Sequence, residues 1–209
     1  MSNCLKGAQR IIFALGENDN IPGTRVLQDG ARTVVDALAR LEKVNTGYVP
    51  PRIIVLSSST WNEKFAAARP RLLHWAIRNA FVHAYADLLQ AHTYLLADPS
   101  LASVLLIQPG ALVDRPPTGH EISTESILPC ATYGDLASGI VECALNSEYD
   151  KISAVGVSSK DGDDGMKYGP SMMYMIIRGL CATFVPGFWT MNRWTNWLVA
   201  KVVPRQKAD

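Results

Sequence analysis

The stretch RIIVLSSST, residues 52–60, decides the fold. Its apolar part, Ile53 to Leu56, is long enough for a strand and offers no polar residue to either face. Such a run is typical of a strand buried on both sides of a parallel sheet. The serines at 57–59 follow the carboxyl end of that strand, which is where open α/β sheets bind their ligands. We therefore expect a parallel sheet with a binding crevice at these serines.

A second strand and a helix lie upstream of this stretch. Residues 10–15 form another apolar run, which Gly16 ends, and residues 26–43 repeat apolar side chains with a helical period. A turn rich in glycine and proline at 45–51 leads into the strand at 53. Strand, helix and strand in this order predict a βαβ unit with a right-handed crossover.

The downstream half continues the alternation of helices and strands. We expect helices at 71–96 and 136–145, strands at 102–108, 128–132 and 152–157, and loops at 111–126 and 158–169. Asp135 is the expected N-cap of the second of these helices. A helical segment over 171–203, interrupted at Pro186 and Gly187, completes the chain. The fold class is therefore α/β, a parallel sheet flanked by helices, with a helical C-terminal segment.

Composition excludes several classes of function. The 209 residues, 48% of them hydrophobic, suit one domain with a sizeable core, and a net charge of +1 argues against nucleic-acid or anionic-membrane binding. No CxxC pairing joins the four cysteines, so we expect free thiols in a reducing compartment. The first residues contain no long apolar run after a basic start, and residues 179–192 are too short and broken to span a bilayer. We therefore expect a cytoplasmic protein.

Four motifs in a fixed order give the chain a family resemblance. They are ALG at 14–16, LSSS at 56–59, QPGAL at 108–112, each after a strand, and YGDLA at 133–137, which opens a helix. In this order, residues 10–157 resemble the later half of a Rossmann domain of the short-chain dehydrogenase/reductase superfamily. The atypical, NmrA-like group of fungal NAD(P)-binding proteins is the most similar branch.

The resemblance implies a role for each of the predicted site residues. The catalytic hydroxyls would be Ser59 and Tyr85, the latter 26 residues further along. His120 is a candidate for a different reason: it lies on the long loop after the third strand, which in the expected fold would cover a small-molecule substrate. Six residues would bind NAD(P): Leu15, Gly16, Ser57, Ser58, Pro109 and Gly110. Each also has a purely structural interpretation, such as satisfying backbone groups at a strand end or packing a ring on the sheet.

Two features of the family pattern are absent from these 209 residues. The glycine-rich βαβ unit that receives the pyrophosphate does not occur, so we expect a partial, N-terminally truncated Rossmann-like domain. Four residues after Tyr85 stands Leu89, where the family has a lysine that assists the tyrosine.

Metal binding is not expected. His74, His83 and His92 are spaced nine residues apart, so neighbours face opposite sides of a helix and one ion cannot reach two of them. The acidic run at 161–165 lacks the glycine and glutamate positions of an EF-hand.

Three functions remain open from the sequence. The first is an NAD(P)-dependent oxidoreductase acting on a hydrophobic small metabolite of secondary metabolism. The second is a cofactor-independent isomerase, cyclase or ligand-binding protein that uses the same crevice, and the third is a regulatory NmrA-like pseudo-enzyme. We divide the chain into a Rossmann-like domain at 1–158 and a packed C-terminal segment at 159–209. Since the strand at 10–15 would lie inside the complete sheet, we expect its edge to be covered, by the C-terminal helices or by a second subunit of a homo-oligomer.

Overall fold

Five strands form one sheet in the computed structural model, which describes residues 2–17 and 19–202. In order across the sheet they are β1 (Arg10–Phe13), β2 (Arg52–Leu56), β3 (Ser103–Ile107), β7 (Ala154–Ser159) and β5 (His120–Ser123). The first four are parallel, and β5 runs antiparallel to β7. A separate pair of parallel strands consists of β4 (Ala111–Val113) and β6 (Cys130–Thr132). The predicted α/β fold with a parallel sheet flanked by helices is therefore confirmed.

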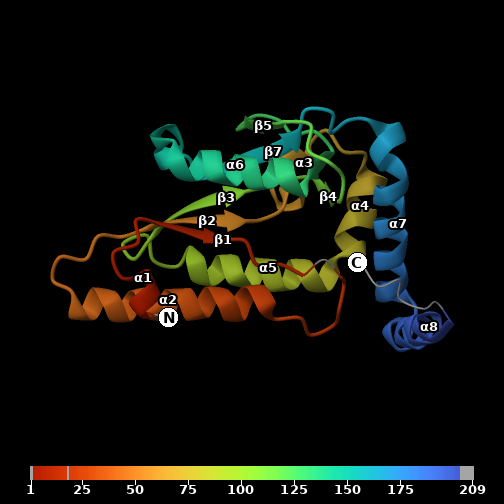
Figure 1. Ribbon diagram of the computed structural model, residues 1–209, viewed down its shortest axis with the longest axis horizontal. Helices are drawn as coiled ribbons and strands as arrows, with labels where there is room; N and C mark the ends of the chain where they lie inside the picture. Colours follow the sequence, from red (N-terminus) through yellow and green to blue (C-terminus); the bar gives the residue numbers. More distant parts are fainter. Residues whose placement is uncertain (1, 18, 203–209) are drawn as a thin grey trace, which may run out of the picture.

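Helices cover both faces of the sheet. Those that pack on it are α2 (Val26–Val44), α5 (Val82–Leu95) and α6 (Tyr133–Leu145). Figure 1 shows α2 and α5 side by side on one face and α6 on the other. The remaining helices are α1 (Ser2–Leu5), α3 (Glu63–Ala66), α4 (Arg71–Ala80), α7 (Gly165–Phe184), α8 (Phe188–Val202) and the 3₁₀ turns η1 (Ser59–Trp61) and η2 (Ser147–Lys151).

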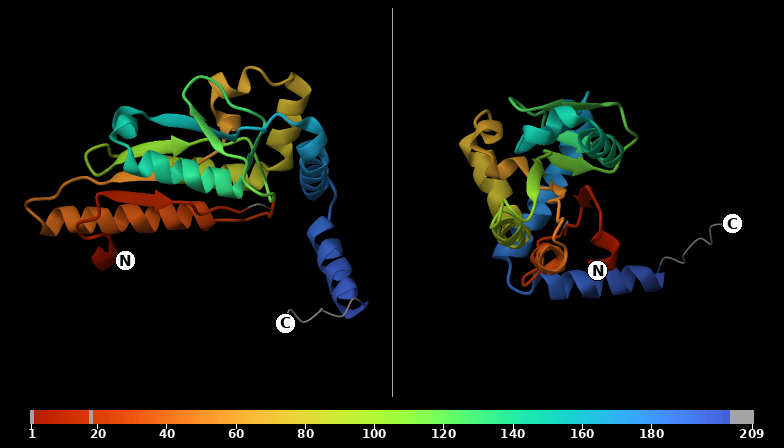
Figure 2. Two further views of the ribbon diagram at one scale, coloured as in Figure 1. Left: turned by 45° about the horizontal axis from the view of Figure 1, so that its top comes forward. Right: turned by 90° about the vertical axis from the view of Figure 1, so that its left-hand side faces the viewer.

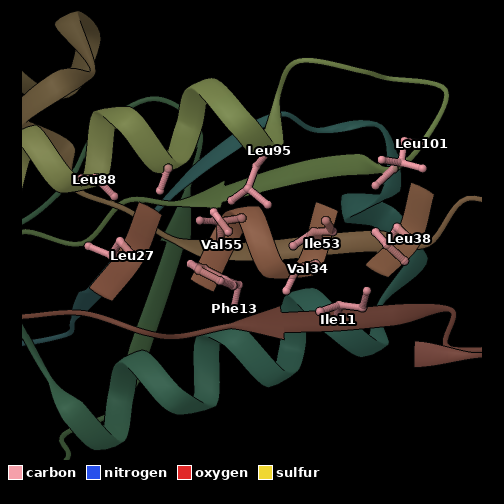
Figure 3. Packing of buried hydrophobic residues seen from close by; sticks show 13 residues of the cluster. Ile11, Phe13, Leu27, Val34, Leu38, Ile53, Val55, Leu88, Leu95 and Leu101 are labelled. Atoms are coloured by element: carbon pink, nitrogen blue, oxygen red, sulfur yellow. The ribbon is translucent and has the colours of Figure 1, made fainter. Parts of the chain in front are cut away.

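The apolar run of β2 is buried on both faces, as its sequence predicts. Ile53 and Val55 face α2 and α5, in the cluster drawn in Figure 3, whereas Ile54 faces α6. Each of the three is at most 1% exposed. Burying one such side chain contributes about 1.5–3 kcal/mol to folding. β2 therefore anchors both halves of the core and fixes where residues 57–60 leave the sheet.

The helix expected over 71–96 is broken at Phe81. This residue has φ −126° and ψ 28° and separates α4 from α5. The side-chain oxygen of Asn20 accepts a hydrogen bond from the backbone of His83 at 2.8 Å, so a residue from another loop satisfies the start of α5. The break lets α4 leave the sheet and pack on α7.

Three further expectations need correction. The loop expected at 111–126 contains β4 and β5, whose short and only partly buried strands have no long apolar run to reveal them. The strand expected at 128–132 pairs with β4 and not with the main sheet. The N-cap of α6 is Thr132, whose hydroxyl accepts from the backbone of Asp135 at 3.1 Å, so Asp135 itself lies in the first turn.

The C-terminal helices pack at one end of the sheet. α7 lies against α4, and α8 projects from the end of α7 (Figure 2). Together they hold the loop after β1: Arg178 is ion-paired with Asp19, and the indole nitrogen of Trp189 donates to the carbonyl oxygen of Asn20 at 3.1 Å. In the described part of the chain β1 pairs with β2 alone. Coverage of its other edge by a second subunit stays a prediction.

None of the helices in the described residues combines the length and the apolar character that a bilayer span requires.

Candidate functional site

The three serines after β2 serve three different purposes. Ser57 is buried, and its hydroxyl has no hydrogen-bond partner within residues 2–17 and 19–202. Ser58 caps η1, since its hydroxyl accepts from the backbone of Thr60 at 3.3 Å. Ser59 accepts a hydrogen bond of 2.5 Å from Nη2 of Arg69. At the strand end, Ser57 therefore has a hydroxyl that is unpaired within the described part of the chain, Ser58 caps η1, and Ser59 accepts a hydrogen bond from the guanidinium of Arg69.

Tyr85 meets this strand end through a residue that the sequence motifs do not include. Its hydroxyl lies 3.0 Å from Oγ1 of Thr60, and either oxygen can donate. Nη1 of Arg69 donates to the same Thr60 oxygen at 3.3 Å. Ser59 and Tyr85, the two predicted catalytic residues, are therefore brought together, with Thr60 and Arg69 between them.

Aromatic side chains pack around the phenol ring of Tyr85. The ring of Trp61 contacts that of Tyr85 edge-on, with centroids 5.8 Å apart. The ring centroid of Phe81, the residue between α4 and α5, lies 5.9 Å from that of Tyr85. The guanidinium of Arg78 lies 4.4 Å from the centre of the Trp61 ring, in a cation–π contact. This packing fixes the ring of Tyr85 beside the strand end.

A hollow of about 900 Å³ opens beside these residues. Residues of η1, α3, α4, α5 and the turn between α3 and α4 line it, among them Thr60, Trp61, Arg69, His74, Trp75, Arg78 and Tyr85. Its volume suits a small organic molecule, since ligand sites typically span about 300–1,000 Å³.

The electrostatic environment of the hollow is positive. Burial lowers the pKa of the Arg69 guanidinium below its ordinary value. The pKa of His74 is lowered as well, first by burial and then by the nearby charges of Arg69 and Arg78. His74 is therefore held in its neutral form at pH 7, and the arginines remain the cations of the hollow.

The loop after β1 holds Leu15 and Gly16, two of the residues expected to contact a nucleotide. Nothing lies within 4 Å of the position that a Cβ of Gly16 would take, and Leu15 is exposed. The next helix, α2, cannot receive a phosphate at its start, because both carboxylate oxygens of Asp87 occupy it. They accept from the backbone nitrogens of Leu27 and Gln28, each at 2.9 Å.

Pro109 and Gly110 have a structural reason for their identity. The carbonyl oxygen of Pro109 accepts from the backbone of Ser59 at 3.1 Å and so fixes the strand end. A Cβ at Gly110 would lie 2.2 Å from the carbonyl oxygen of Pro129, so only glycine fits where β4 starts beside the loop before β6. A contact of these residues with a cofactor stays a prediction.

His120 lies apart from the other predicted residues. It begins β5, with β7 and β3 between it and β2, and its Nε2 pairs with Oε2 of Glu142 on α6 at 2.8 Å. His120 therefore lies at the same carboxyl edge of the sheet as Ser59, but on the outermost strand, three positions across the sheet from β2. Its contact with a substrate stays a prediction. Across the described ranges, no three His, Cys, Asp or Glu side chains gather in a way that could hold a metal ion.

Sequence reasoning missed Thr60 and Arg69. Thr60 is the fourth hydroxyl residue in the run from 57, and this continuity was the available signal. Arg69 carries no local signal, because its approach to Ser59 depends on the turn through η1 and α3 that brings residue 69 back over the strand end.

Sequence comparison relates the chain to proteins that are named oxidoreductases. No protein-family model matches the chain. The chain is 30% identical over 208 residues to oxidoreductase ordB of Dothistroma septosporum, an alignment that covers 100% of this chain and 76% of ordB. It is 31% identical over 194 residues to oxidoreductase GME11367 of Pestalotiopsis microspora, covering 91% of this chain and 72% of the relative.

A solved structure resembles the fold as well. The crystal structure of the oxidoreductase ylbE from Lactococcus lactis matches with a TM-score of 0.53 and 25% sequence identity. The match covers 76% of this chain and 65% of that protein. The chain therefore spans a little under two thirds of the length of this solved relative.

Proposed function

Because the chain belongs to the family of fungal oxidoreductases that includes ordB and GME11367, we propose that it reduces a carbonyl group of a hydrophobic small metabolite with NAD(P)H. The observation that carries the proposal is the meeting of Tyr85, Thr60 and Arg69 at the carboxyl end of β2. A phenol, a hydroxyl and a guanidinium there face a hollow of ligand size.

Side chains of this protein supply the proton and stabilise the developing negative charge in this reaction. Tyr85 donates its hydroxyl proton to the carbonyl oxygen of the substrate, and Thr60 holds the Tyr85 hydroxyl in place at 3.0 Å. Arg69 stabilises the negative charge that develops on that oxygen, as preorganised donors do in oxyanion sites. In this proposal the positive charge comes from Arg69 at the strand end, since Leu89 stands where the short-chain dehydrogenase/reductase pattern has lysine.

The residues that the structure describes fit one end of the nucleotide. Leu15, Gly16 and Ser57 would contact the nicotinamide ribose, with open space at Gly16 and an unpaired hydroxyl at Ser57. A bound nicotinamide would supply the hydride. The start of α2 does not fit a phosphate, because Asp87 already occupies its backbone N–H groups.

The test is reduction of an aromatic quinone, 9,10-phenanthrenequinone, followed by the loss of NADPH or NADH absorbance. The proposal expects turnover with at least one nucleotide and a fall of at least ~100-fold in Tyr85→Phe, the lower end of the range for a positioned general acid. Tyr94→Phe, on the same helix, is the matched control. Equal rates in Tyr85→Phe and wild type would contradict the proposal.

The finer parts of the proposal concern family and context. We place the chain in the atypical, NmrA-like branch of the short-chain dehydrogenase/reductase superfamily, and its substrate in secondary metabolism. The order of the four motifs at 14–16, 56–59, 108–112 and 133–137 supports the branch. The exposed aromatic and apolar side chains around the hollow, including Trp75, support a hydrophobic substrate.

A second candidate is a cofactor-independent isomerase or cyclase in the same hollow. The carboxylate of Asp87 at the start of α2 favours it, because a negative charge there opposes a phosphate. Thermal unfolding with NADPH and NADH separates the two candidates. A nucleotide that binds only the folded protein raises the midpoint temperature, whereas a cofactor-independent enzyme shows no shift at millimolar nucleotide.

A further inference from the structure

The hollow beside Tyr85 carries uncompensated positive charge. Three arginines line it, Arg69, Arg71 and Arg78, and the acid among its lining residues is Glu63. The ion pairs between described residues involve other cations and leave these three arginines without a carboxylate. A hollow with this excess of positive charge attracts anions.

Arg69 is the strongest indication of an anionic ligand. It is partly buried, yet its two hydrogen bonds go to neutral hydroxyls, those of Ser59 at 2.5 Å and Thr60 at 3.3 Å. A cation removed from water without a counter-charge is unfavourable, and a bound anion would relieve that penalty. The remaining N–H groups of the guanidinium are suited to a carboxylate, which the planar fork can bind through two oxygens.

The walls of the hollow restrict the class of anion. Arg78 lies over the ring of Trp61, which places a second guanidinium beside an aromatic surface. Trp75, half exposed and stacked on Phe184, adds another ring to the lining. An inorganic anion would use the arginines alone, whereas a flat aromatic acid would use both the cations and the indole rings.

We propose that this hollow binds a planar aromatic carboxylate, with the carboxylate at Arg69 and Arg78 and the aromatic ring against Trp61 and Trp75. The inference rests on the proposed function in one respect, since it names the charged end of the molecule whose carbonyl Tyr85 would face. The binding itself requires neither nucleotide nor turnover, so it can be measured separately.

The probe is 2-naphthoate, titrated into the protein without nucleotide and followed by calorimetry. 2-Naphthamide supplies the same ring without the charge, and inorganic phosphate supplies charge without the ring. We expect 2-naphthoate to bind at least ~10-fold more tightly than either, because a charge-assisted hydrogen bond is worth about that factor or more. Equal affinity for the acid and the amide overturns the proposal, as does phosphate binding that exceeds that of 2-naphthoate.

Charge variants locate the site. Arg69→Gln should weaken 2-naphthoate binding by at least ~10-fold. Arg69→Lys keeps the charge but not the planar guanidinium, so its affinity should lie between those of wild type and Arg69→Gln. Arg40→Gln, exposed on α2 and away from the hollow, is the control for net charge. An equal loss in Arg40→Gln and Arg69→Gln overturns the proposal.

A second position keeps the test decisive if Arg69→Gln does not fold. Arg78 is exposed, so Arg78→Gln should fold as wild type does and should still weaken 2-naphthoate several-fold. Unchanged binding in Arg78→Gln overturns the assignment. The proposed function fails separately: if Tyr85→Phe leaves quinone reduction unchanged while 2-naphthoate binding depends on Arg78, the anion site stands without the reductase mechanism.

Discussion

The hydroxyl oxygens of Thr60 and Tyr85 lie 3.0 Å apart, although 25 positions separate the two residues in the chain. The same Thr60 oxygen also accepts a hydrogen bond from Arg69, so its hydroxyl links the cation to the phenol. Thr60→Val keeps the shape and removes the hydroxyl. We expect it to lower quinone reduction by ~10-fold, with a larger effect on kcat than on KM, because Tyr85 loses its positioning bond.

Ser58→Ala is the control for this prediction, since the Ser58 hydroxyl caps η1 and does not contact Tyr85. Steady-state kinetics of both variants against wild type provide the measurement. A Ser58→Ala enzyme that is slower than Thr60→Val would contradict the assignment of Thr60.

Asp87 is expected to stabilise the fold by capping α2. The helix has no side-chain cap of its own, and Asp87 supplies the missing acceptors to Leu27 and Gln28 from α5. Asp87→Ala should lower the free energy of unfolding by about 2–3 kcal/mol, since it leaves one buried and one partly buried backbone donor without an acceptor. Urea denaturation measures the change. Asp36→Ala, exposed on α2, should differ from wild type by less than about 0.5 kcal/mol.

Gly179 is expected to tolerate no larger residue. A Cβ there would lie 2.2 Å from the carbonyl oxygen of Ala80, so α7 can approach α4 only through glycine. Gly179→Ala should cost about 1–3 kcal/mol of unfolding free energy, as overpacking does. Gly165→Ala, at the start of α7 with open space around it, should change stability little. Equal melting curves for the two variants would refute this account of the α4–α7 contact.

Asp161 should make stability depend on pH in the acid range. Lys167 donates to it at 2.5 Å, Thr118 at 2.6 Å and Tyr168 at 2.9 Å, and these hydrogen bonds, led by that of Lys167, lower its pKa from 3.8 to about 2. A pKa below its unfolded value means that the stabilisation is complete above the unfolded pKa and is lost as pH falls towards 2. Asp161→Asn should therefore be less stable than wild type at pH 7.

The gap between the two proteins should close between pH 4 and pH 2, as urea curves across that range will show. Asp163→Asn, two residues along and exposed, is the control and should follow wild type at every pH. A gap that stays constant from pH 7 to pH 2 would contradict the role of the ionised carboxylate.

Two of the cysteines should be unreactive in the folded protein. Burial raises the pKa of the thiols of Cys130 and Cys143 to about 11, whereas Cys4 is exposed. Because the thiolate is the reactive form, Ellman's reagent at pH 8 should modify Cys4 quickly and leave Cys130 and Cys143 unmodified until denaturant is added. Mass spectrometry of the labelled peptides identifies the sites. Rapid labelling of Cys143 without denaturant would contradict the buried position.

The parallel sheet could be predicted because its strands are buried on both faces. Ile53, Ile54 and Val55 leave no polar alternation, and a strand of that kind has few structural interpretations. The short strand β5 could not be predicted, because it lies at the sheet edge and its sequence HEIS is only partly buried. The same reason hid β4, which has three residues.

The candidate site was only half predictable. Ser59 and Tyr85 could be paired because the family resemblance implies a catalytic hydroxyl at each, a role that stays a prediction. Arg69 and Thr60 were not found, because their contact depends on the path of η1 and α3 after the strand. Gly110 has a structural reason that its motif did not reveal: the carbonyl oxygen of Pro129 already requires a glycine there, whereas its cofactor contact stays a prediction.

The start of α2 and the start of α5 are each satisfied by a side chain from about 60 residues away, Asp87 for the first and Asn20 for the second. The start of α2, which precedes β2 in the sequence, therefore depends on Asp87, which follows β2. The start of α5, which follows β2, depends on Asn20, which precedes it. During synthesis α2 leaves the ribosome before its cap has been made, and most of the stability of a helix in a protein comes from tertiary contacts of this kind. We therefore expect both helix starts to be stabilised only when contacts distant in the chain have formed, which is typical of slower folding.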